Sequence, residues 1–174
     1  TVCMACVKLG CELFPGKSYA GESIPVAIGI DPKYFSNRLD VCYTFDKHDL
    51  GKLLPARMMN SHKGSYGKVL MITGSPGMAG AAFLSAFAAY TVGAGLVQIY
   101  TASENRLALQ ELLPEAIISC YDSYDDSQLS HLLDWADVVF IGCGLGMGQI
   151  SEKILKNVLK NVSCPCVIDA DGLN

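Results

Sequence analysis

Residues 68–82 read KVLMITGSPGMAGAA, and this stretch decides the fold class. Its first part, 68–73, is a β-branched and apolar run of the length of a buried strand. The sequence GSPG at 74–77 then interrupts the run with residues that favour turns. Residues 78–92 are rich in alanine and carry apolar side chains on several sides, which predicts a largely buried helix. The stretch therefore predicts a strand, a glycine-rich loop and a helix in direct succession.

The same alternation continues to the end of the chain. Because strand and helix alternate at every step, an α/β fold is expected, with parallel strands joined by right-handed helical crossovers. Ligands of such sheets bind beyond the carboxyl ends of the strands. The further strands are expected at 96–100, 117–119, 138–141 and 166–169, and the further helices at 103–112, 125–135 and 151–159, with Ser103 and Asp125 or Asp126 as caps.

The first part of the chain lacks this regularity. Strands are expected at 24–30 and 41–45, separated by turn-forming residues. We place the domain junction near residue 40, which gives domains of residues 1–40 and 41–174. The chain begins without methionine and ends directly after an expected strand, so we expect a fragment of a longer protein.

Composition argues against several kinds of partner. The 174 residues are 51% hydrophobic and 17% charged, which suits a buried parallel sheet. The formal net charge is -4 and no long basic run occurs, so neither nucleic acid nor an anionic membrane is an expected partner. No apolar run reaches the roughly 18 residues of a membrane span. No signal-peptide pattern is present.

The eight cysteines do not follow the spacing of a metal site. Cys3 and Cys6 form one C-x-x-C pair, and Cys164 and Cys166 flank a proline. A structural zinc site usually needs a second pair or two nearby histidines. We therefore expect no metal site, and a zinc site is the less favoured alternative. We interpret the cysteines as small hydrophobic residues of a cytoplasmic protein.

Three loops lie where a parallel sheet binds ligands. The loop at 74–82 has three glycines at spacing three before a helix N-terminus, which suits either an anion such as pyrophosphate or a plain tight turn. The sequence GCGLGMG at 142–148 favours a ligand, because each additional glycine costs roughly 0.5–1 kcal/mol of chain entropy. In DADGLN at 169–174 the two carboxylates would point to one side of an extended chain. They suit a ribose hydroxyl, a metal-bound phosphate or simple turn capping.

Other segments give weaker signals. In SHKGSYG at 61–67, Lys63 suits a loop that covers an anion, although most lysines are simply solvated. Glu104, past the second expected strand, could stand where dinucleotide-binding folds place a ribose-binding acid. The P-loop, the G-x-G-x-x-G fingerprint after the first strand and the G-x-S-x-G elbow are all absent from the sequence.

Taken in order, these motifs resemble those of the ADP-dependent NAD(P)H-hydrate dehydratases. The resemblance implies the N-terminal half of a ribokinase-like domain, covering about residue 46 to the end. It implies a lyase that removes water from the hydrated nicotinamide ring of NADH or NADPH and consumes ADP. The segments that carry it are SHKGSYGKVL at 61–70, GS at 74–75, GMAGAA at 77–82, GAGLV at 93–97, LPE at 113–115, WADVV at 135–139, IGCGLG at 141–146 and VIDADGLN at 167–174.

Residues 1–30 resemble the end of an NAD(P)H-hydrate epimerase domain. The matching segments are TV at 1–2, KLG at 8–10, FPGK at 14–17 and GI at 29–30. The resemblance implies the C-terminal piece of a Rossmann-like domain, which precedes the dehydratase in bifunctional bacterial members. It also implies an isomerase activity for the longer protein, which interconverts the two hydrate epimers and uses K⁺.

The resemblance also implies roles for individual residues. It assigns hydrated NADH or NADPH to Ala81 and Gly144, and makes Gly80, Asp171 and Asn174 neighbours of that site. It implies ADP as co-substrate, Mg²⁺ and a homo-oligomer. The catalytic residues are expected downstream, because the His-Pro-Gly-Glu segment, the ADP-binding loop and the Gly-Asp motif of the family follow the last matched strand.

Two departures and two alternatives accompany this resemblance. Cys143 stands where the family usually has proline, and Gly172 stands where it usually has alanine. The alternatives are a sugar or vitamin kinase of the ribokinase-like superfamily and a non-catalytic nucleotide-binding module. The segments at 61–67 and 77–81 favour the dehydratases over the kinases. The chain by itself is expected to be inactive.

Overall fold

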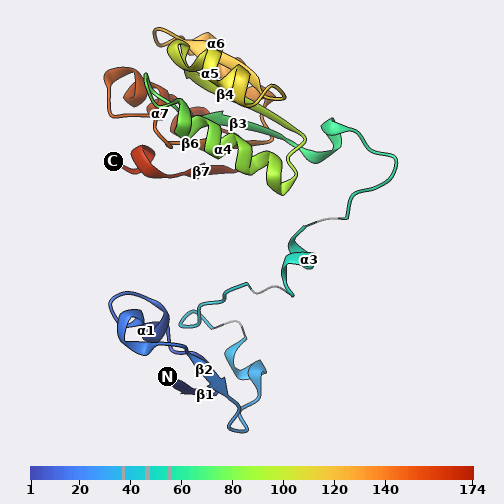
Figure 1. Cartoon of the computed structure of the whole chain (residues 1–174), viewed down its shortest axis with the longest axis vertical. Helices are drawn as coiled ribbons and strands as arrows, with labels where there is room; N and C mark the ends of the chain where they lie inside the picture. Colours follow the sequence, from blue (N-terminus) through green and yellow to red (C-terminus); the bar gives the residue numbers. More distant parts are fainter. Residues whose placement is uncertain (37, 46–47, 55) are drawn as a thin grey trace. The chain divides into compact units, whose positions relative to one another are not determined.

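The computed structural model describes residues 1–36, 38–45, 48–54 and 56–174 and divides them into two units (Figure 1). The first unit is Thr1–Ala56 and the second is Arg57–Asn174. The predicted junction near residue 40 stays a prediction. No helix in the described ranges is long and apolar enough to cross a membrane.

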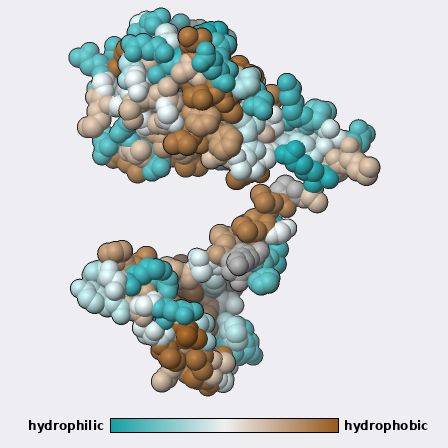
Figure 2. Space-filling model, viewed as in Figure 1, coloured by the Kyte–Doolittle hydropathy of each residue, from teal (hydrophilic) through white to brown (hydrophobic). Residues whose placement is uncertain are grey.

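The first unit is built around a two-stranded parallel sheet. Its strands pair along their full length, with Val2 opposite Ile24. Apolar side chains of these strands remain exposed, and brown side chains gather over them in Figure 2. The elements are β1 (Val2–Met4), α1 (Leu9–Glu12), α2 (Lys17–Ala20), β2 (Ile24–Val26), the 3-10 turn η1 (Pro32–Phe35) and α3 (Leu50–Leu53).

Two expectations for this unit are wrong. The strand expected at 24–30 is only three residues long, because β1 offers only three residues as its partner. Residues 41–45 form no strand, although their pattern predicts one. A strand needs a neighbouring strand for its backbone hydrogen bonds, and no described residue pairs with this segment.

The second unit contains a five-stranded parallel sheet, as the alternation predicts. The strand order is β5-β4-β3-β6-β7, so β3 lies at the centre. The strands are β3 (Lys68–Ile72), β4 (Leu96–Ala102), β5 (Ile117–Tyr121), β6 (Val138–Ile141) and β7 (Cys166–Ile168). The helices are α4 (Ala79–Val92), α5 (Arg106–Leu112), α6 (Asp126–Trp135) and α7 (Gln149–Asn161), with 3-10 turns η2 (Lys63–Tyr66), η3 (Ser103–Asn105) and η4 (Ala170–Leu173).

The strand order creates a switch point between β3 and β6. From β3 the chain moves outward through β4 and β5, and then returns to the other side of β3 for β6 and β7. Ile72 pairs with Ile141, so β3 and β6 end at the same level. The loops that follow these two strands therefore start side by side, which is the usual place of a ligand in such sheets.

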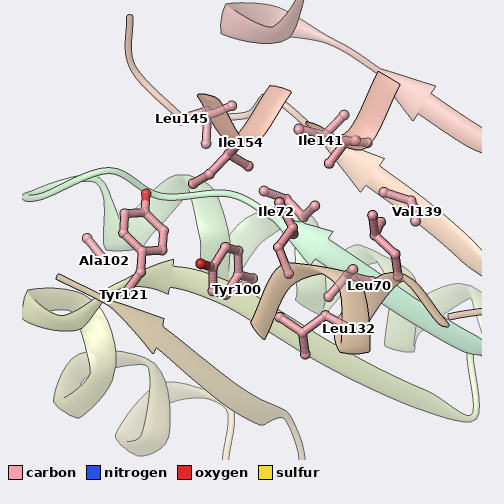
Figure 3. Packing of buried hydrophobic residues seen from close by; sticks show 13 residues of the cluster. Leu70, Ile72, Tyr100, Ala102, Tyr121, Leu132, Val139, Ile141, Leu145 and Ile154 are labelled. Carbon is pink, nitrogen blue, oxygen red and sulfur yellow. The ribbon is translucent and has the colours of Figure 1, made fainter. Parts of the chain in front are cut away.

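Helices cover both faces of this sheet (Figure 1). Alternate residues of β3 face opposite ways, since Met71 packs with residues of α4 and α5 whereas Leu70 and Ile72 pack with residues of α6 and α7. Figure 3 shows the second of these clusters, in which Tyr100 and Tyr121 lie among aliphatic side chains. Both sides of the sheet are thus buried, which explains the apolar composition of its strands.

The helix starts follow the sequence in one case and depart from it in another. Asp125 caps α6, as expected, and its carboxylate accepts a hydrogen bond from the Gln128 N–H at 3.1 Å. Ser103 does not cap a helix, because residues 103–105 form a 3-10 turn and α5 begins at Arg106. The Asn105 amide makes no cap for α5 either, since it bonds to the loop after β3.

Removal of the α6 cap should destabilise the second unit. We expect Asp125→Ala to lower the free energy of unfolding by about 1 kcal/mol, because the N–H of Gln128 loses its acceptor. Urea denaturation followed by circular dichroism measures this change. Ser127→Ala, at an exposed position in the first turn of the same helix, is the control and should leave stability nearly unchanged. Equal losses in both variants would contradict the capping role.

Candidate functional site

Two backbone hydrogen bonds join the glycine loops that follow β3 and β6. The Gly74 N–H donates to the Cys143 carbonyl at 3.1 Å, and the Ser75 N–H donates to the Gly144 carbonyl at 2.5 Å. The loops therefore continue the pairing of the two central strands beyond the point where the sheet ends. Main-chain hydrogen bonds thus join the two loops directly.

Ala81 and Gly144, which the sequence assigns to one site, lie against each other. Gly144 has a φ of +63°, and a Cβ placed on it would lie 2.6 Å from the Cβ of Ala81 and 3.2 Å from that of Met78. Since α4 begins at Ala79, the second glycine loop packs on the first turn of this helix. Gly144 is therefore required by the fold itself, whether or not a ligand touches it.

Gly80 differs from Gly144 because nothing in its surroundings requires a glycine. A Cβ added at Gly80 would meet no atom within 4 Å, and the residue is exposed. Met78, which precedes α4, gives no side-chain cap to this helix. The first turn of α4 therefore has no side-chain cap, although the Ala81 N–H already donates to the Met78 carbonyl at 3.2 Å, and the positive end of the helix dipole lies at this turn.

The acidic residues after β7 contact the second glycine loop, although not in the expected way. Their carboxylates were expected to point to one side of an extended chain. Instead, β7 ends at Ile168 and Ala170 has a φ of +49°, so the chain turns there. The Asp171 carboxylate accepts the Gly146 N–H at 2.8 Å, and Asp169 lies 3.9 Å from the Cys143 thiol.

Asn174, the remaining residue assigned to this site, is exposed. Its N–H donates to the Asp171 carbonyl at 3.5 Å. It therefore lies next to the acidic turn that contacts the second glycine loop.

Asn105 and Thr101 are residues of this region that sequence reasoning missed. The Asn105 amide donates to the carbonyls of Gly74 and Ser75, at 2.9 Å each. The Thr101 hydroxyl donates to the Gly74 carbonyl at 2.7 Å, and both side chains are buried. Together they hold the turn after β3 from the side of β4. An asparagine just before a helix indicates a cap, and only the tertiary fold reveals its different role.

The segment at 61–67 lies at the opposite edge of the sheet from the glycine loops, so Lys63 does not cover them within this unit. It leads into the amino end of β3, and the Gly95 N–H, just before β4, donates to the Tyr66 carbonyl at 3.0 Å. His62 caps the η2 turn, with its Nδ1 accepting from the Gly64 N–H at 3.1 Å.

A cavity of about 590 Å³ opens beside the glycine loops at the carboxyl edge of the sheet. Tyr121 lines it, and burial raises the pKa of this residue, so the hydroxyl stays protonated. Glu104 and Asp122 add two carboxylates to its walls. The lining residues lie at the ends of β4 and β5, in the segments that follow β3, β4, β5 and β6, and in the first turn of α7: Ser75, Pro76, Ala102, Ser103, Glu104, Tyr121, Asp122, Leu145, Gly146, Gly148, Gln149, Ile150 and Ser151.

Comparison with protein families identifies this arrangement. The family model of NAD(P)H-hydrate dehydratase matches residues 69–174, which include all five strands of the sheet except the first residue of β3. The chain belongs to the NAD(P)H-hydrate dehydratase family. The glycine loops at the switch point are thus loops of a dehydratase domain.

Two relatives match different lengths of the chain. A bifunctional NAD(P)H-hydrate repair enzyme of Coxiella burnetii is 36% identical over 174 residues, which is 100% of this chain and 35% of the relative. An ADP-dependent (S)-NAD(P)H-hydrate dehydratase of Listeria monocytogenes is 36% identical over 122 residues, which is 69% of this chain and 44% of the relative. The chain therefore spans well under half the length of these dehydratase-family relatives.

Solved structures agree with the expected ribokinase-like fold. A ribokinase-like superfamily protein of Enterococcus faecalis superposes with a TM-score of 0.69 at 28% identity, over 77% of this chain and 49% of that one. An ADP/ATP-dependent NAD(P)H-hydrate dehydratase of Bacillus subtilis, co-crystallised with ATP/Mg²⁺, gives a TM-score of 0.57 at 30% identity, over 69% and 43% of the chains. The predicted family and fold class are confirmed.

Within the described ranges, no group of three or more His, Cys, Asp or Glu side chains could hold a metal ion. Mg²⁺, which the resemblance implies, is usually held by one or two carboxylates together with substrate phosphates, so it does not require such a group.

The contact between Gly144 and Ala81 can be separated from backbone strain by mutation. Gly77 also has a positive φ, of +81°, but a Cβ there would meet nothing within 4 Å. We expect Gly77→Ala to lower the free energy of unfolding by about 1–2 kcal/mol, from strain alone. Gly144→Ala should cost about 1–3 kcal/mol more, because its new methyl group overpacks against Ala81. Chemical denaturation measures both values.

A double-mutant cycle provides the decisive comparison for this contact. Adding Ala81→Gly to Gly144→Ala should recover most of the additional loss, since the methyl group that causes the clash is then gone. If Gly77→Ala and Gly144→Ala cost the same, or if the double variant shows no recovery, the packing explanation of Gly144 is wrong.

Proposed function

We propose that this chain supplies the substrate-binding half of an ADP-dependent dehydratase that removes water from the hydrated nicotinamide ring of NADH or NADPH. The observation that carries the proposal is the joining of two glycine loops at the switch point of a dehydratase-family sheet. A dinucleotide has a pyrophosphate, and an uncapped helix N-terminus beside exposed glycines suits such an anion.

Each binding residue has a distinct part in this proposal. The free N–H groups at the first turn of α4 bind the pyrophosphate, and Gly80 lets the substrate approach the backbone closely. Ala81 and Gly144 form the small-residue surface on which the substrate rests. Asp171 fixes the second loop through the Gly146 N–H and therefore acts through the backbone. The role of these residues is to bind and orient the hydrated dinucleotide.

No chemical step is assigned to a residue of this chain. Mg²⁺ would supply charge neutralisation for the phosphates of the nucleotide when bound, and no step is derived through the ion. The ADP co-substrate is proposed because relatives carry ADP dependence in their names. The cytoplasmic location and self-association stay predictions, as does the lack of nucleic-acid and membrane partners.

The first unit is proposed to be the C-terminal part of an NAD(P)H-hydrate epimerase domain. A bifunctional relative matches all of this chain, whereas a dehydratase matches 69% of it. The exposed apolar side chains of Val2, Met4 and Ile24 support a larger domain around β1 and β2. The longer protein would then also be an isomerase that uses K⁺, with a junction near residue 40. No observation favours a sugar or vitamin kinase over this reading.

A negative charge at Gly80 should separate binding from stability. Gly80→Asp places a carboxylate in the first turn of α4, where it favours the helix by about 0.3–1 kcal/mol. The same charge repels the pyrophosphate, so we expect the affinity for hydrated NADH to fall on the order of tenfold. Isothermal titration calorimetry measures the affinity, and thermal unfolding measures the stability.

Gly80→Asn is the matched control, because it has nearly the same shape without the charge. It should retain more affinity than Gly80→Asp, and the difference should shrink at high salt. Unchanged binding by a folded Gly80→Asp variant would show that the pyrophosphate does not bind at the first turn of α4.

The 174-residue chain alone should not catalyse the reaction. The chain spans only 35% of the bifunctional relative and matches only 44% of the dehydratase, and the described residues include no identified catalytic group. We expect no ADP-dependent recovery of NADH absorbance when hydrated NADH is incubated with the chain and ADP. A relative of full length, assayed in parallel, is the positive control. Turnover by the chain would show that its own residues include the catalytic ones.

A further inference from the structure

The cavity at the carboxyl edge contains a polar group without a protein partner. Tyr121 is 7% exposed and lines the cavity, and no described residue makes a hydrogen bond with its hydroxyl. Figure 3 shows this hydroxyl pointing away from its own strand toward Leu145, which also lines the cavity. This hydroxyl is not among the fully buried side-chain atoms that lack a partner, so it is accessible from the cavity. It therefore suits a ligand with a hydrogen-bonding group.

Two acidic side chains stand on the walls of the same cavity. Glu104 follows β4 and Asp122 follows β5, and these two strands are neighbours in the sheet. Both residues are exposed and carry full negative charges that no described side chain neutralises through an ion pair. Carboxylates accept hydrogen bonds from hydroxyl groups and repel phosphate.

The position of Glu104 in the sheet indicates a ligand for these carboxylates. The chain runs from the central strand β3 through α4 to β4, and Glu104 is the second residue after β4. In Rossmann-type dinucleotide-binding sheets, whose first five strands follow the same order as β5-β4-β3-β6-β7, the pyrophosphate lies at the loop after the first strand. In the same sheets, an acidic residue after the second strand binds the unphosphorylated ribose. Ser75 and Pro76 of the first glycine loop also line the cavity, so the two places are continuous.

We propose that this cavity binds the adenosine ribose of hydrated NADH, whose 2′-hydroxyl carries the additional phosphate in NADPH, and that Glu104 with Asp122 selects hydrated NADH over hydrated NADPH. The inference rests on the proposed function, because it specifies which of the two hydrated dinucleotides the proposed site binds. Tyr121 supplies a hydrogen bond to the sugar or the attached base. A volume of about 590 Å³ accommodates one nucleoside.

Positive groups near the cavity do not reverse this selection. The N-terminus of α7 lies at the wall through Gly148, Gln149 and Ile150, and it contributes about half a positive charge. Two full carboxylate charges outweigh it for a 2′-phosphate. Arg106 interacts with the Cys120 thiol and does not line the cavity. The local field therefore remains unfavourable to an additional phosphate.

Calorimetric titration of the chain with hydrated NADH and with hydrated NADPH tests the proposal. We expect the unmodified chain to bind hydrated NADH at least about tenfold more tightly, the value of one unfavourable charge contact. Glu104→Gln should bring the two affinities to within about threefold of each other. Glu104→Arg should reverse the preference, since a guanidinium accommodates a 2′-phosphate. Glu111→Gln, an exposed glutamate on α5 outside the cavity, should keep the original preference.

The outcomes separate this inference from the proposed function. Equal affinities for the two hydrates in the unmodified chain would overturn the selection by Glu104 and leave the dehydratase proposal standing. Binding of neither hydrate would overturn both. A titration with ADP distinguishes the source of the ribose. If Glu104→Gln weakens ADP as much as hydrated NADH, the cavity belongs to the co-substrate and the assignment is wrong.

A direct probe of the cavity uses AMP and its isomer adenosine 2′-monophosphate. In nuclear magnetic resonance titrations, AMP should shift the Tyr121 and Glu104 amide signals, whereas the 2′-isomer should require at least about tenfold higher concentration. Tyr121→Phe keeps the ring and removes the hydroxyl, and it should weaken AMP about threefold to tenfold. Identical responses to the two isomers, or no response at these signals, would contradict the ribose site.

Discussion

The site depends on two backbone hydrogen bonds, from Gly74 to the Cys143 carbonyl and from Ser75 to the Gly144 carbonyl. They extend the contact between β3 and β6 past the end of the sheet. Main-chain bonds of this kind keep their geometry when side chains change, but they require the two chains to approach closely. That requirement explains why the loops are rich in glycine, because a side chain at Gly144 would collide with Ala81.

Polar side chains also contact the two loops that these bonds join. Thr101 and Asn105 bring side-chain donors from the β4 side to the Gly74 carbonyl, while Asp171 brings an acceptor from the β7 side to the Gly146 N–H. A buried carbonyl or N–H without a partner is unfavourable, so the turns after β3 and β6 need these groups. Side chains on or just after β4 thus hold the loop after β3, and a side chain after β7 holds the loop after β6. The two backbone hydrogen bonds join these loops to each other.

Sequence patterns predicted the sheet well because its strands and helices are locally determined. Residues 68–73 are apolar and β-branched, and Asp125 has a local cap geometry, so both are visible from neighbours in the chain. The failures have long-range causes. Residues 41–45 have a strand pattern without a partner strand, and Asn105 leaves its helix to bond Gly74, 31 residues away. The family motifs predict one site for Ala81 and Gly144, and the fold shows that the two residues lie against each other; their role in binding stays a prediction.

The same loop pair has two unlike sides, and this difference constrains how a dinucleotide can lie. On the side of α4, Ala81 and Met78 pack against Gly144 too closely to admit a ligand between them, so a substrate must lie over the exposed N-terminal turn. On the other side, Ser75 and Gly146 form part of the cavity wall. An elongated ligand with an anionic centre can therefore cross from the helix N-terminus, over Ser75, into the cavity. The anion would lie where N–H groups are free, and its neutral sugar would lie where carboxylates reject further phosphate.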